Sequence, residues 1–240
     1  MKIKVLGKNS FVARNILFSN EVKYFDKKYL NQIDKLEKFK IPKWDILIYF
    51  FAYYGEDKIV SEHVNYKYFK KIFDLNISKK YIYISTLDTL NKNVNSIYKL
   101  NKLKSEIFSS KFKNIKVVRL SYPFGFGQSE DRLIPKIIQK LNNNTEIVIN
   151  DFLIRLTPVN YISEEEILNE NFKHHNITPS NSELFSKIVN KLKKNLRSKS
   201  KIFIKNTNSI DQFSDIDHSL GIVDANIYLS NLCKAMIVNI

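Results

Sequence analysis

WDILIYFFA, residues 44–52, is a nearly continuous apolar run between Pro42 and Gly55. Such a run is typical of a parallel β-strand buried on both faces, because a strand with one face in water alternates apolar and polar residues. Parallel strands also need long crossover connections, which are usually helices. The fold class therefore depends on whether helical segments stand on both sides of this strand.

Strand-like and helix-like segments do alternate on both sides of it. The β-rich runs are 2–6, 21–25, 80–86 and 115–121, and the helical patterns are 11–19, 27–39, 60–75 and 96–111. Strands that alternate with helices indicate βαβ units. We therefore predict an α/β fold with a doubly wound, Rossmann-like parallel sheet.

The pattern changes after residue 125. Helices are predicted at 131–143 and 182–195, the latter with Ser182 as its N-cap, and strands at 145–150 and 201–205, before a C-terminal helix. No repeat or linker interrupts this half. We expect a core domain over 1–125 and a small α/β lobe over 126–240 that packs on it, with some segments returning to the sheet.

The composition indicates the broad class of protein to which the chain belongs. Hydrophobic residues make up 44% of the 240 residues, which indicates a soluble globular chain. We see no signal peptide and no apolar run long enough for a membrane helix, and the one cysteine, Cys233, suits a reducing cytoplasm. The net charge of +15 is spread along the chain. We therefore expect a cytoplasmic protein with no membrane and no nucleic acid among its partners.

The turn after the first strand carries a reduced glycine motif. Its spacing is that of Gly-x-x-Gly-x-x-Gly, with Gly7 kept and with Ser10 and Ala13 at the other two positions. Such a turn between a strand and a helix can hold a dinucleotide pyrophosphate. Asp26 follows 19 residues after Gly7, where an acidic residue would bind the ribose. It could equally cap the next helix, and the two lysines after it leave the choice between NAD and NADP open.

SIYKLNKLKSEIF, residues 96–108, places a tyrosine and a lysine four residues apart on one helical face. An ammonium beside the phenol of Tyr98 would favour its ionised form, so Lys102 would lower its pKa. Such a pair could be a tuned acid/base. In a chain with 39 Lys plus Arg and 13 Tyr it could also arise by chance, as Tyr68 and Lys71 do at a similar spacing.

Together these motifs resemble the extended short-chain dehydrogenase/reductase family, in particular its nucleotide-sugar epimerases and reductases. The resemblance runs in order over most of the chain. It lies in KVLGKNSFVARNI (4–16), DILIYFFAYY (45–54), HVNYKYFKKIF (63–73), YIYIST (81–86), YKLNKLKSE (98–106), VVRLSYPFGFGQ (117–128), INDFLIRLTPVNYI (149–162) and NITPSNSELFSKIV (176–189).

The resemblance implies roles for particular residues. Tyr98 would be the general acid/base, Lys102 would tune it and bind the nicotinamide ribose, and Thr86 would hold the reacting oxygen. The implied contacts of an NAD or NADP cofactor are Gly7, Asn9, Ser10, Phe11, Val12, Asp26, Phe50, Phe51, Ala52, Tyr98, Lys102 and Pro123. A nucleotide-sugar substrate would contact Ser85, Thr86 and Arg155, and the C-terminal lobe would be its substrate lobe.

Departures from the family pattern narrow the reaction. Thr86 is followed by Leu87 and Asp88 rather than by the Asp-Glu pair of the 4,6-dehydratases, so water elimination is not expected. Tyr98 follows only 12 positions after Thr86, and the chain is short. We therefore predict a keto-sugar reductase of surface-polysaccharide or deoxysugar biosynthesis, with a nucleotide-sugar epimerase as the alternative.

Three further points stay open or negative. A non-catalytic Rossmann-like binding protein is the alternative of another class. A homodimer is compatible with the resemblance. No metal site is expected, because His174 and His175 have no cysteine or further histidine at ligand spacing.

Overall fold

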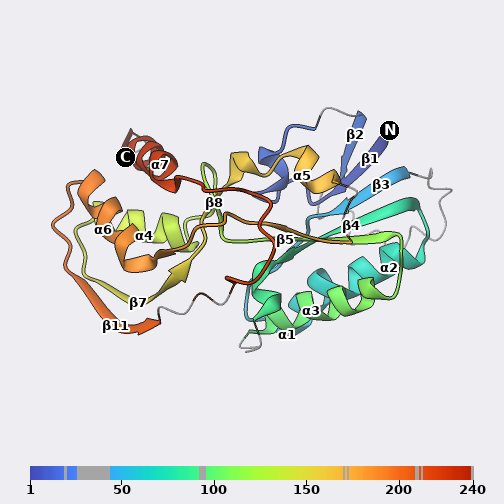
Figure 1. Cartoon of the computed structure of the whole chain (residues 1–240), viewed down its shortest axis with the longest axis horizontal. Helices are drawn as coiled ribbons and strands as arrows, with labels where there is room; N and C mark the ends of the chain where they lie inside the picture. The colour runs from blue at the N-terminus through green and yellow to red at the C-terminus, as the bar shows by residue number, and fades with distance from the viewer. Residues whose placement is uncertain are drawn as a thin grey trace. The chain divides into compact units, whose positions relative to one another are not determined.

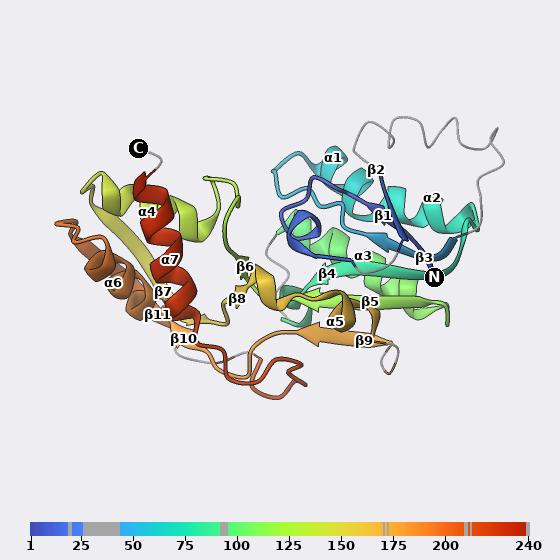
Figure 2. The same ribbon diagram turned by 90° about the horizontal axis from the view of Figure 1, so that it is seen from above.

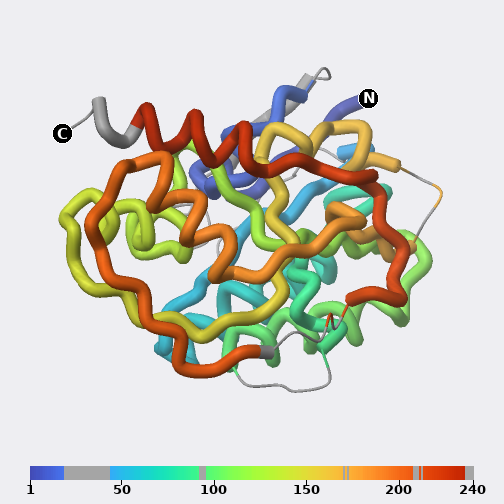
Figure 3. The backbone as a smooth tube through the Cα atoms, turned by 60° about the vertical axis from the view of Figure 1, so that its left-hand side comes forward, coloured from blue at the N-terminus to red at the C-terminus, as the bar shows by residue number. Residues whose placement is uncertain are grey.

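The computed structural model of the chain describes residues 1–18, 21–25, 44–91, 96–169, 171, 173–208, 211 and 213–238. They form two compact units: residues 1–120 with 162–177, and residues 121–161 with 178–240. The boundary predicted from the sequence lies at residue 125. Figure 3 traces the chain as it leaves the first unit and comes back to it for residues 162–177.

The first unit is built on a six-stranded sheet in which every neighbouring pair is parallel. In spatial order the strands are β2 (Glu21–Phe25), β1 (Lys2–Leu6), β3 (Trp44–Tyr49), β4 (Ser78–Thr86), β5 (Ile115–Leu120) and β9 (His174–Ile177). The predicted parallel α/β sheet is therefore confirmed. The strand order reverses between β1 and β3, and α/β proteins bind ligands outside the carboxyl ends of strands at such a point.

Helices cover both faces of this sheet. Figures 1 and 2 show α1 (Lys58–Glu62), α2 (Tyr68–Asp74) and α3 (Ile97–Ser110) on one face and α5 (Glu164–Leu168) on the other. The face under α1 to α3 is filled by aromatic rings, among them Tyr49, Phe69 and Tyr83. Among the described residues, no helix has the length and apolar character to cross a membrane.

The helix predicted over 60–75 contains one turn of π-helix, His63–Lys67, between α1 and α2. A π turn frees carbonyl groups from the regular ladder. Here the carbonyl of Val64 accepts from the hydroxyl of Tyr49, and that of Asn65 accepts from Tyr83, each at 2.5 Å. The turn thus satisfies two buried tyrosine hydroxyls that the aromatic core could not.

The helix predicted over 11–19 is wrong. The chain makes only a 3₁₀ turn, Ala13–Asn15, and Ile16 is already extended. The Asn15 side chain donates to the carbonyl of Phe11 at 2.7 Å, which is the carbonyl that its own N–H would bond in an α-helix. The Asn15 N–H bonds Val12 instead, at 3.0 Å. Asparagine competes in this way with helical hydrogen bonds, so the turn goes no further. The helix predicted over 27–39 lies outside the described residues.

The second unit packs three helices on a three-stranded sheet in the order β10-β7-β11. Its elements are β6 (Pro123–Phe124), α4 (Leu133–Asn142), β7 (Ile147–Ile154), β8 (Thr157–Pro158), β10 (Glu183–Leu184), α6 (Phe185–Asn195), β11 (Ile202–Asn208) and α7 (Ala225–Val238). Cys233 is buried in its core.

The start of α6 corrects another prediction. Ser182 does not cap this helix, because its hydroxyl donates to Asp211 at 2.8 Å. Asp151 of β7 acts in its place: its carboxylate accepts from the N–H and the hydroxyl of Ser186, at 2.7 and 2.6 Å. A carboxylate at this position satisfies N–H groups that the first helical turn leaves unpaired.

Candidate active site at the carboxyl ends of the central strands

Lys102 is a buried lysine on the inner face of α3. It is 2% exposed, and its Nζ donates to the carbonyl oxygens of Ile84 at 2.8 Å and Phe51 at 3.5 Å. Ile84 lies near the carboxyl end of β4, and Phe51 follows β3. The same Nζ lies 4.6 Å from the ring centroid of Tyr83 and 5.8 Å from that of Tyr98. Burial lowers the pKa of Lys102 to about 7, because a lysine loses its hydration on entering the protein.

Tyr98 stands one turn before Lys102 and is partly buried. The pKa of Tyr98 lies well above 10, chiefly because burial disfavours the phenolate. Tyr54 also raises this pKa, through its charge and through a side-chain hydrogen bond. Tyr83 and Asp88 raise it further. The expectation that Lys102 lowers this pKa is therefore not met: burial acts on both groups, and a lysine with a pKa near 7 is only partly charged at neutral pH.

The lowered pKa of Lys102 predicts a pH dependence of stability. Unfolding restores a pKa near 10.5, so between pH 7 and 9.5 the unfolded chain binds more protons and the free energy of unfolding rises with pH, by up to about 1.4 kcal/mol per pH unit. The pKa of Lys4, lowered by burial to about 8, adds to the same trend. Urea denaturation from pH 7 to 9.5 should show a weaker rise for Lys102→Met than for the wild type. Lys70→Met, at an exposed position, should retain the full rise; an equal rise in all three proteins would contradict the assignment.

Thr86 ends β4 and is followed by a 3₁₀ turn, Leu87–Leu90. Its hydroxyl lies 3.3 Å from a carboxylate oxygen of Asp88 and 3.4 Å from the Asp88 N–H. Burial raises the pKa of Asp88. The Lys99 ammonium donates to the carbonyl of Asn91 at 2.6 Å. Burial lowers the pKa of Lys99, and the charge of Asp88 raises it. Thr86 is thus held beside an acidic group at the same end of the sheet as Tyr98.

Ser85, the neighbour of Thr86, points into a buried polar network. Its hydroxyl donates to Glu106 at 2.6 Å, as does that of Thr89 at 2.7 Å. The Arg119 guanidinium bonds the other carboxylate oxygen through Nε at 3.0 Å and a terminal nitrogen at 2.5 Å. This network, Ser85, Thr89, Glu106 and Arg119, joins β4, α3 and β5. The Ser85 hydroxyl is therefore committed to the protein interior, and Thr86 is the other predicted substrate residue at this end of β4.

The glycine loop approaches β3 at Gly7. This glycine has φ +94°, and a Cβ there would lie 3.1 Å from backbone atoms of Phe50 and Phe51. The Ser10 hydroxyl accepts from the Ala13 N–H at 3.2 Å, which leaves its own proton for another acceptor. Asn9 lies in the same turn.

Two main-chain donors of this loop are available to a further ligand. Within the described residues, the N–H groups of Phe11 and Val12 have no hydrogen-bond acceptor. Backbone N–H groups in such turns suit phosphate oxygens. The loop therefore fits a pyrophosphate without the help of a long helix, because only the 3₁₀ turn Ala13–Asn15 follows it.

The segment after β3 borders the same end of the sheet. Phe50 and Phe51 are buried, and Ala52 is partly buried. The side chain of Asn65 fixes Tyr53, the residue after Ala52. The Asn65 amide accepts from the N–H of Tyr53 at 3.1 Å and donates to the carbonyl of Tyr53 at 2.8 Å. This pair of bonds sets the course of the chain beyond residue 52.

The remaining predicted residues lie elsewhere. Asp26 falls outside the described residues. Pro123 and Arg155 belong to the second unit. Pro123 begins β6, and its carbonyl accepts from Gln128 at 2.8 Å. Arg155 is 5% exposed, and its guanidinium bonds Asp211 at 2.6 Å and the carbonyls of residues 179 and 180.

Sequence reasoning missed two contacts of Tyr98. The ring of Tyr54 packs against that of Tyr98, with centroids 4.3 Å apart. The charge of Asp88 raises the pKa of Tyr98. The sequence did carry a signal for Asp88, as an acidic residue two positions after Thr86. It carried none for Tyr54, whose position depends on the bonds between Tyr53 and Asn65.

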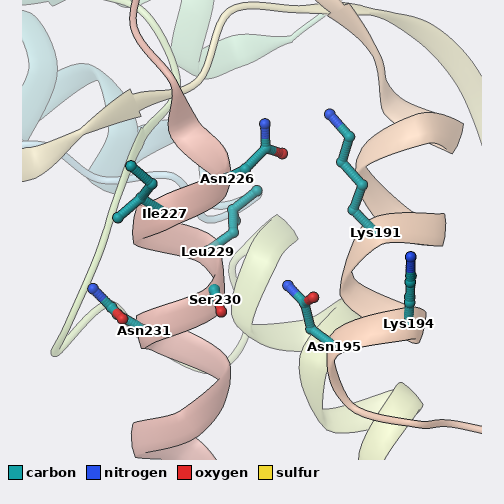
Figure 4. Close-up of a pocket in the computed structure, with 8 residues that line it drawn as sticks. All are labelled: Lys191, Lys194, Asn195, Asn226, Ile227, Leu229, Ser230 and Asn231. Atoms are coloured by element: carbon teal, nitrogen blue, oxygen red, sulfur yellow. The ribbon is translucent and has the colours of Figure 1, made fainter.

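No described group of three or more His, Cys, Asp or Glu side chains is placed to hold a metal ion. A shallow pocket of about 540 Å³ lies between α6 and α7 of the second unit. Figure 4 shows Lys191, Lys194 and Asn195 on one side of it and Asn226, Leu229 and Ser230 on the other. None of the predicted site residues lines this pocket.

Comparisons with known proteins bear on the fold. No model of a known protein family matches the chain, and no curated protein matches it. Solved structures do. UDP-glucose 4-epimerase from Thermotoga maritima, with UDP-glucose, has a TM-score of 0.75 at 12% identity over 100% of this chain and 99% of its own.

Two others have similar scores. UDP-N-acetylglucosamine 4-epimerase from Methanobrevibacter ruminantium, with UDP-N-acetylmuramic acid, gives 0.75 at 17% identity over 100% of this chain and 99% of its own. The dTDP-glucose 4,6-dehydratase from Bacillus anthracis, with NAD, gives 0.74 at 13% over 100% and 97%. At these identities the likeness establishes a shared fold over the whole chain.

Proposed function

We propose that this protein is an NAD(P)-dependent oxidoreductase of the extended short-chain dehydrogenase/reductase type, and that it reduces a nucleotide-linked keto-sugar. The observation that carries the proposal is the placement of Tyr98 and Lys102 at the carboxyl ends of β3 and β4, beside a glycine turn with open N–H donors. The solved structures of the same fold named above are nucleotide-sugar epimerases and a dehydratase, with nucleotide-sugars or NAD bound.

The cofactor would be held by the chain's own groups. The N–H groups of Phe11 and Val12 and the hydroxyl of Ser10 would bind its pyrophosphate, and Gly7 would allow its close approach. Lys102 would bind the nicotinamide ribose through its Nζ. When bound, the reduced nicotinamide supplies a hydride, and the protein supplies orientation and the proton.

The proton would come from Tyr98. In a reduction, the carbonyl carbon of the substrate receives the hydride while its oxygen takes the phenolic proton, and water then returns a proton to the phenolate. Thr86 would hold the carbonyl oxygen within reach of Tyr98 by a hydrogen bond. These steps leave an alcohol, the oxidised cofactor and a protonated Tyr98.

The short chain favours a reductase over an epimerase, because an epimerase must hold and turn its keto intermediate and a small second lobe suits this less. A protonated phenol at Tyr98 suits the proton donor of a reduction. The epimerase stays the second candidate because two of the structures named above are 4-epimerases. NAD retained at one equivalent in the purified protein would favour it, since epimerases regenerate their cofactor in each cycle.

The proposed substrate contact in the second unit is Arg155. Among the described residues, the buried polar atoms without a hydrogen-bond partner include Arg155 Nε, His218 Nδ1 and Ser219 Oγ. Unpaired buried groups are rare in proteins, and a polar ligand is one way to satisfy them. A nucleoside diphosphate offers oxygens for Nε, and it could also replace Asp211 on the terminal nitrogens of Arg155.

We also propose a homodimer. The inner face of α3 is polar, and its outer face exposes Leu100 and Ile107, with Ile59 of α1 exposed as well. Exposed apolar side chains that share one helical face can form a subunit contact. Sedimentation velocity should show a dimer for the wild type and a monomer for Leu100→Lys with Ile107→Lys; a monomeric wild type would remove this part of the proposal.

Cofactor titration tests the proposal at its base. NADH or NADPH fluorescence should report binding to the wild type at sub-millimolar concentration. Gly7→Ala should weaken binding at least about tenfold, because φ +94° strains an alanine and its Cβ would push against Phe50 and Phe51. Gly221→Ala is the control, since nothing lies within 4 Å of a Cβ there. If the wild type binds neither cofactor, the proposed oxidoreductase function is wrong, and a non-catalytic binding protein is favoured.

A further inference from the structure

Arg155 is a buried cation whose donor groups are only partly used. It follows β7 in the second unit and is 5% exposed. Its Nη1 donates to the carbonyl oxygens of Pro179, at 2.8 Å, and Ser180, and its Nη2 donates to Asp211 at 2.6 Å. Among the described residues, its Nε has no acceptor. The cation is therefore held in place from one side and incompletely bonded on the other.

The open Nε belongs to the edge of the guanidinium that suits a bidentate anion. Nε and Nη2 lie side by side, and arginine binds carboxylate or phosphate there through two parallel hydrogen bonds. Arg119 in the first unit uses both nitrogens of this edge, because its Nε and Nη2 both donate to Glu106. Asp211 occupies only the Nη2 half of the same edge of Arg155.

The Asp211 carboxylate has two further donors. The oxygen that Arg155 bonds also accepts from the Ser182 hydroxyl at 2.8 Å, and the other oxygen accepts from the N–H of Phe213 at 3.0 Å. Burial raises the pKa of Asp211, but these two bonds and the charge of Arg155 outweigh it, so that pKa lies below its ordinary value. Asp211 is therefore charged at neutral pH and acts as the counterion of Arg155.

Arg155 and Asp211 differ in their access to water. The side chain of Asp211 is 21% exposed, whereas that of Arg155 is 5% exposed. A buried arginine needs an anion beside it, because a charge left alone in the interior is strongly destabilising. A partly exposed carboxylate recovers its hydration more readily. If one anion replaces the other at this site, Asp211 is thus the partner that leaves.

We propose that Asp211 is an internal competitor of the anion site at Arg155. It neutralises the guanidinium while the site is empty, and it gives way when the diphosphate of a nucleotide ligand takes both Nε and Nη2. The identity of the ligand rests on the proposed function, whereas the competition rests on the geometry of Arg155 and Asp211. Asp211 would therefore determine how tightly this protein holds nucleotide ligands.

The competition has a consequence for affinity. When a site is open in only a fraction of the molecules, the apparent affinity is reduced by that fraction. The reduction applies to every ligand that carries the diphosphate, so it acts on substrate and product alike. The return of Asp211 to Arg155 would favour release of the nucleotide product.

Asp211→Asn tests the competition at constant side-chain shape. The amide oxygen can still accept from Ser182 or Phe213, but no charge opposes the binding of an anion to Arg155. Calorimetric titration with UDP and with inorganic pyrophosphate should show at least about tenfold tighter binding than in the wild type. Asp215→Asn removes the same charge four positions later from an exposed side chain that bonds Ser214, and should change affinity less than about twofold. Equal or weaker binding in Asp211→Asn would overturn the proposal.

A second measurement allows for a loss of stability in this variant. Asp211→Asn leaves Arg155 without its counterion, so its melting temperature should rise more with added UDP than that of the wild type does. Asp211→Asn combined with Arg155→Met leaves no buried charge alone and should lose this extra rise. If UDP raises the melting temperature of all three proteins equally, or of none, Asp211 does not compete for the site.

Activity separates this proposal from the proposed function. Tighter UDP binding in Asp211→Asn, in a protein that reduces no keto-sugar, would support the competition and overturn the proposed function. Unchanged UDP affinity in Asp211→Asn, in a protein that does reduce keto-sugars, would overturn the competition and leave the proposed function standing. If neither protein binds UDP or pyrophosphate, the competition and the proposed substrate contact at Arg155 are both wrong.

Discussion

Tyr98→Phe should lower turnover by about 100-fold or more, the usual scale for losing a positioned acid or base. The change removes only the phenolic hydroxyl, and the ring that packs against Tyr54 stays. Folding and cofactor binding should therefore be nearly unchanged. The measurement is kcat with the best keto-sugar substrate, with NADPH or NADH titrated in parallel.

Two variants sharpen this result. Lys102→Met should lower turnover and also weaken cofactor binding, because Lys102 is assigned both the ribose and the environment of Tyr98. Tyr68→Phe, in the tyrosine–lysine pair on α2 that chance can explain, should have no effect on the rate. Full activity in Tyr98→Phe on an identified substrate would mean that α3 carries no acid/base.

Glu106→Ala should cost about 3–5 kcal/mol of stability. It leaves the Arg119 guanidinium buried without its carboxylate, and removal of one partner from a buried ion pair is strongly destabilising. It also removes the acceptor of Ser85 and Thr89. The chain has one tryptophan, Trp44 on β3, so its fluorescence in urea follows the unit that contains Glu106.

Controls distinguish the pair from a general effect of charge. Glu62→Ala removes a partly exposed carboxylate that pairs with Lys67 and Lys104, and it should change stability little. Glu106→Leu combined with Arg119→Met should be less destabilised than Glu106→Ala, because no buried charge is left alone. If Glu106→Ala is as stable as Glu62→Ala, the buried network contributes nothing to the fold.

The sequence predicts the first unit well because its signals are local or periodic. The apolar run at 44–52 identified a strand buried on both faces, and β3 is that strand. The spacing of Tyr98 and Lys102 placed both on one helix, and α3 carries them. Thr86 ends β4, as a residue at the end of a predicted strand should.

The features that were missed depend on contacts between distant residues. Asn15 stops the first helix through its own side chain, which a hydrophobic pattern does not show. Asp151 begins α6 from 35 positions away. The raised pKa of Tyr98 comes from burial and from Tyr54, a residue held by the bond between Tyr53 and Asn65. Spacing along a helix predicts which side chains are neighbours, but it does not predict how deeply those side chains are buried.

Absorbance at 340 nm tests the central claim most directly. The purified protein is mixed with NADPH or NADH and with UDP- or dTDP-linked 4-keto-sugars that a dehydratase makes in situ. The account predicts that one equivalent of reduced cofactor is oxidised for each keto-sugar consumed, and that Tyr98→Phe slows this by about 100-fold or more. Interconversion of nucleotide-sugars with no net loss of reduced cofactor would contradict it in favour of an epimerase, and so would the absence of oxidation with every nucleotide keto-sugar tried.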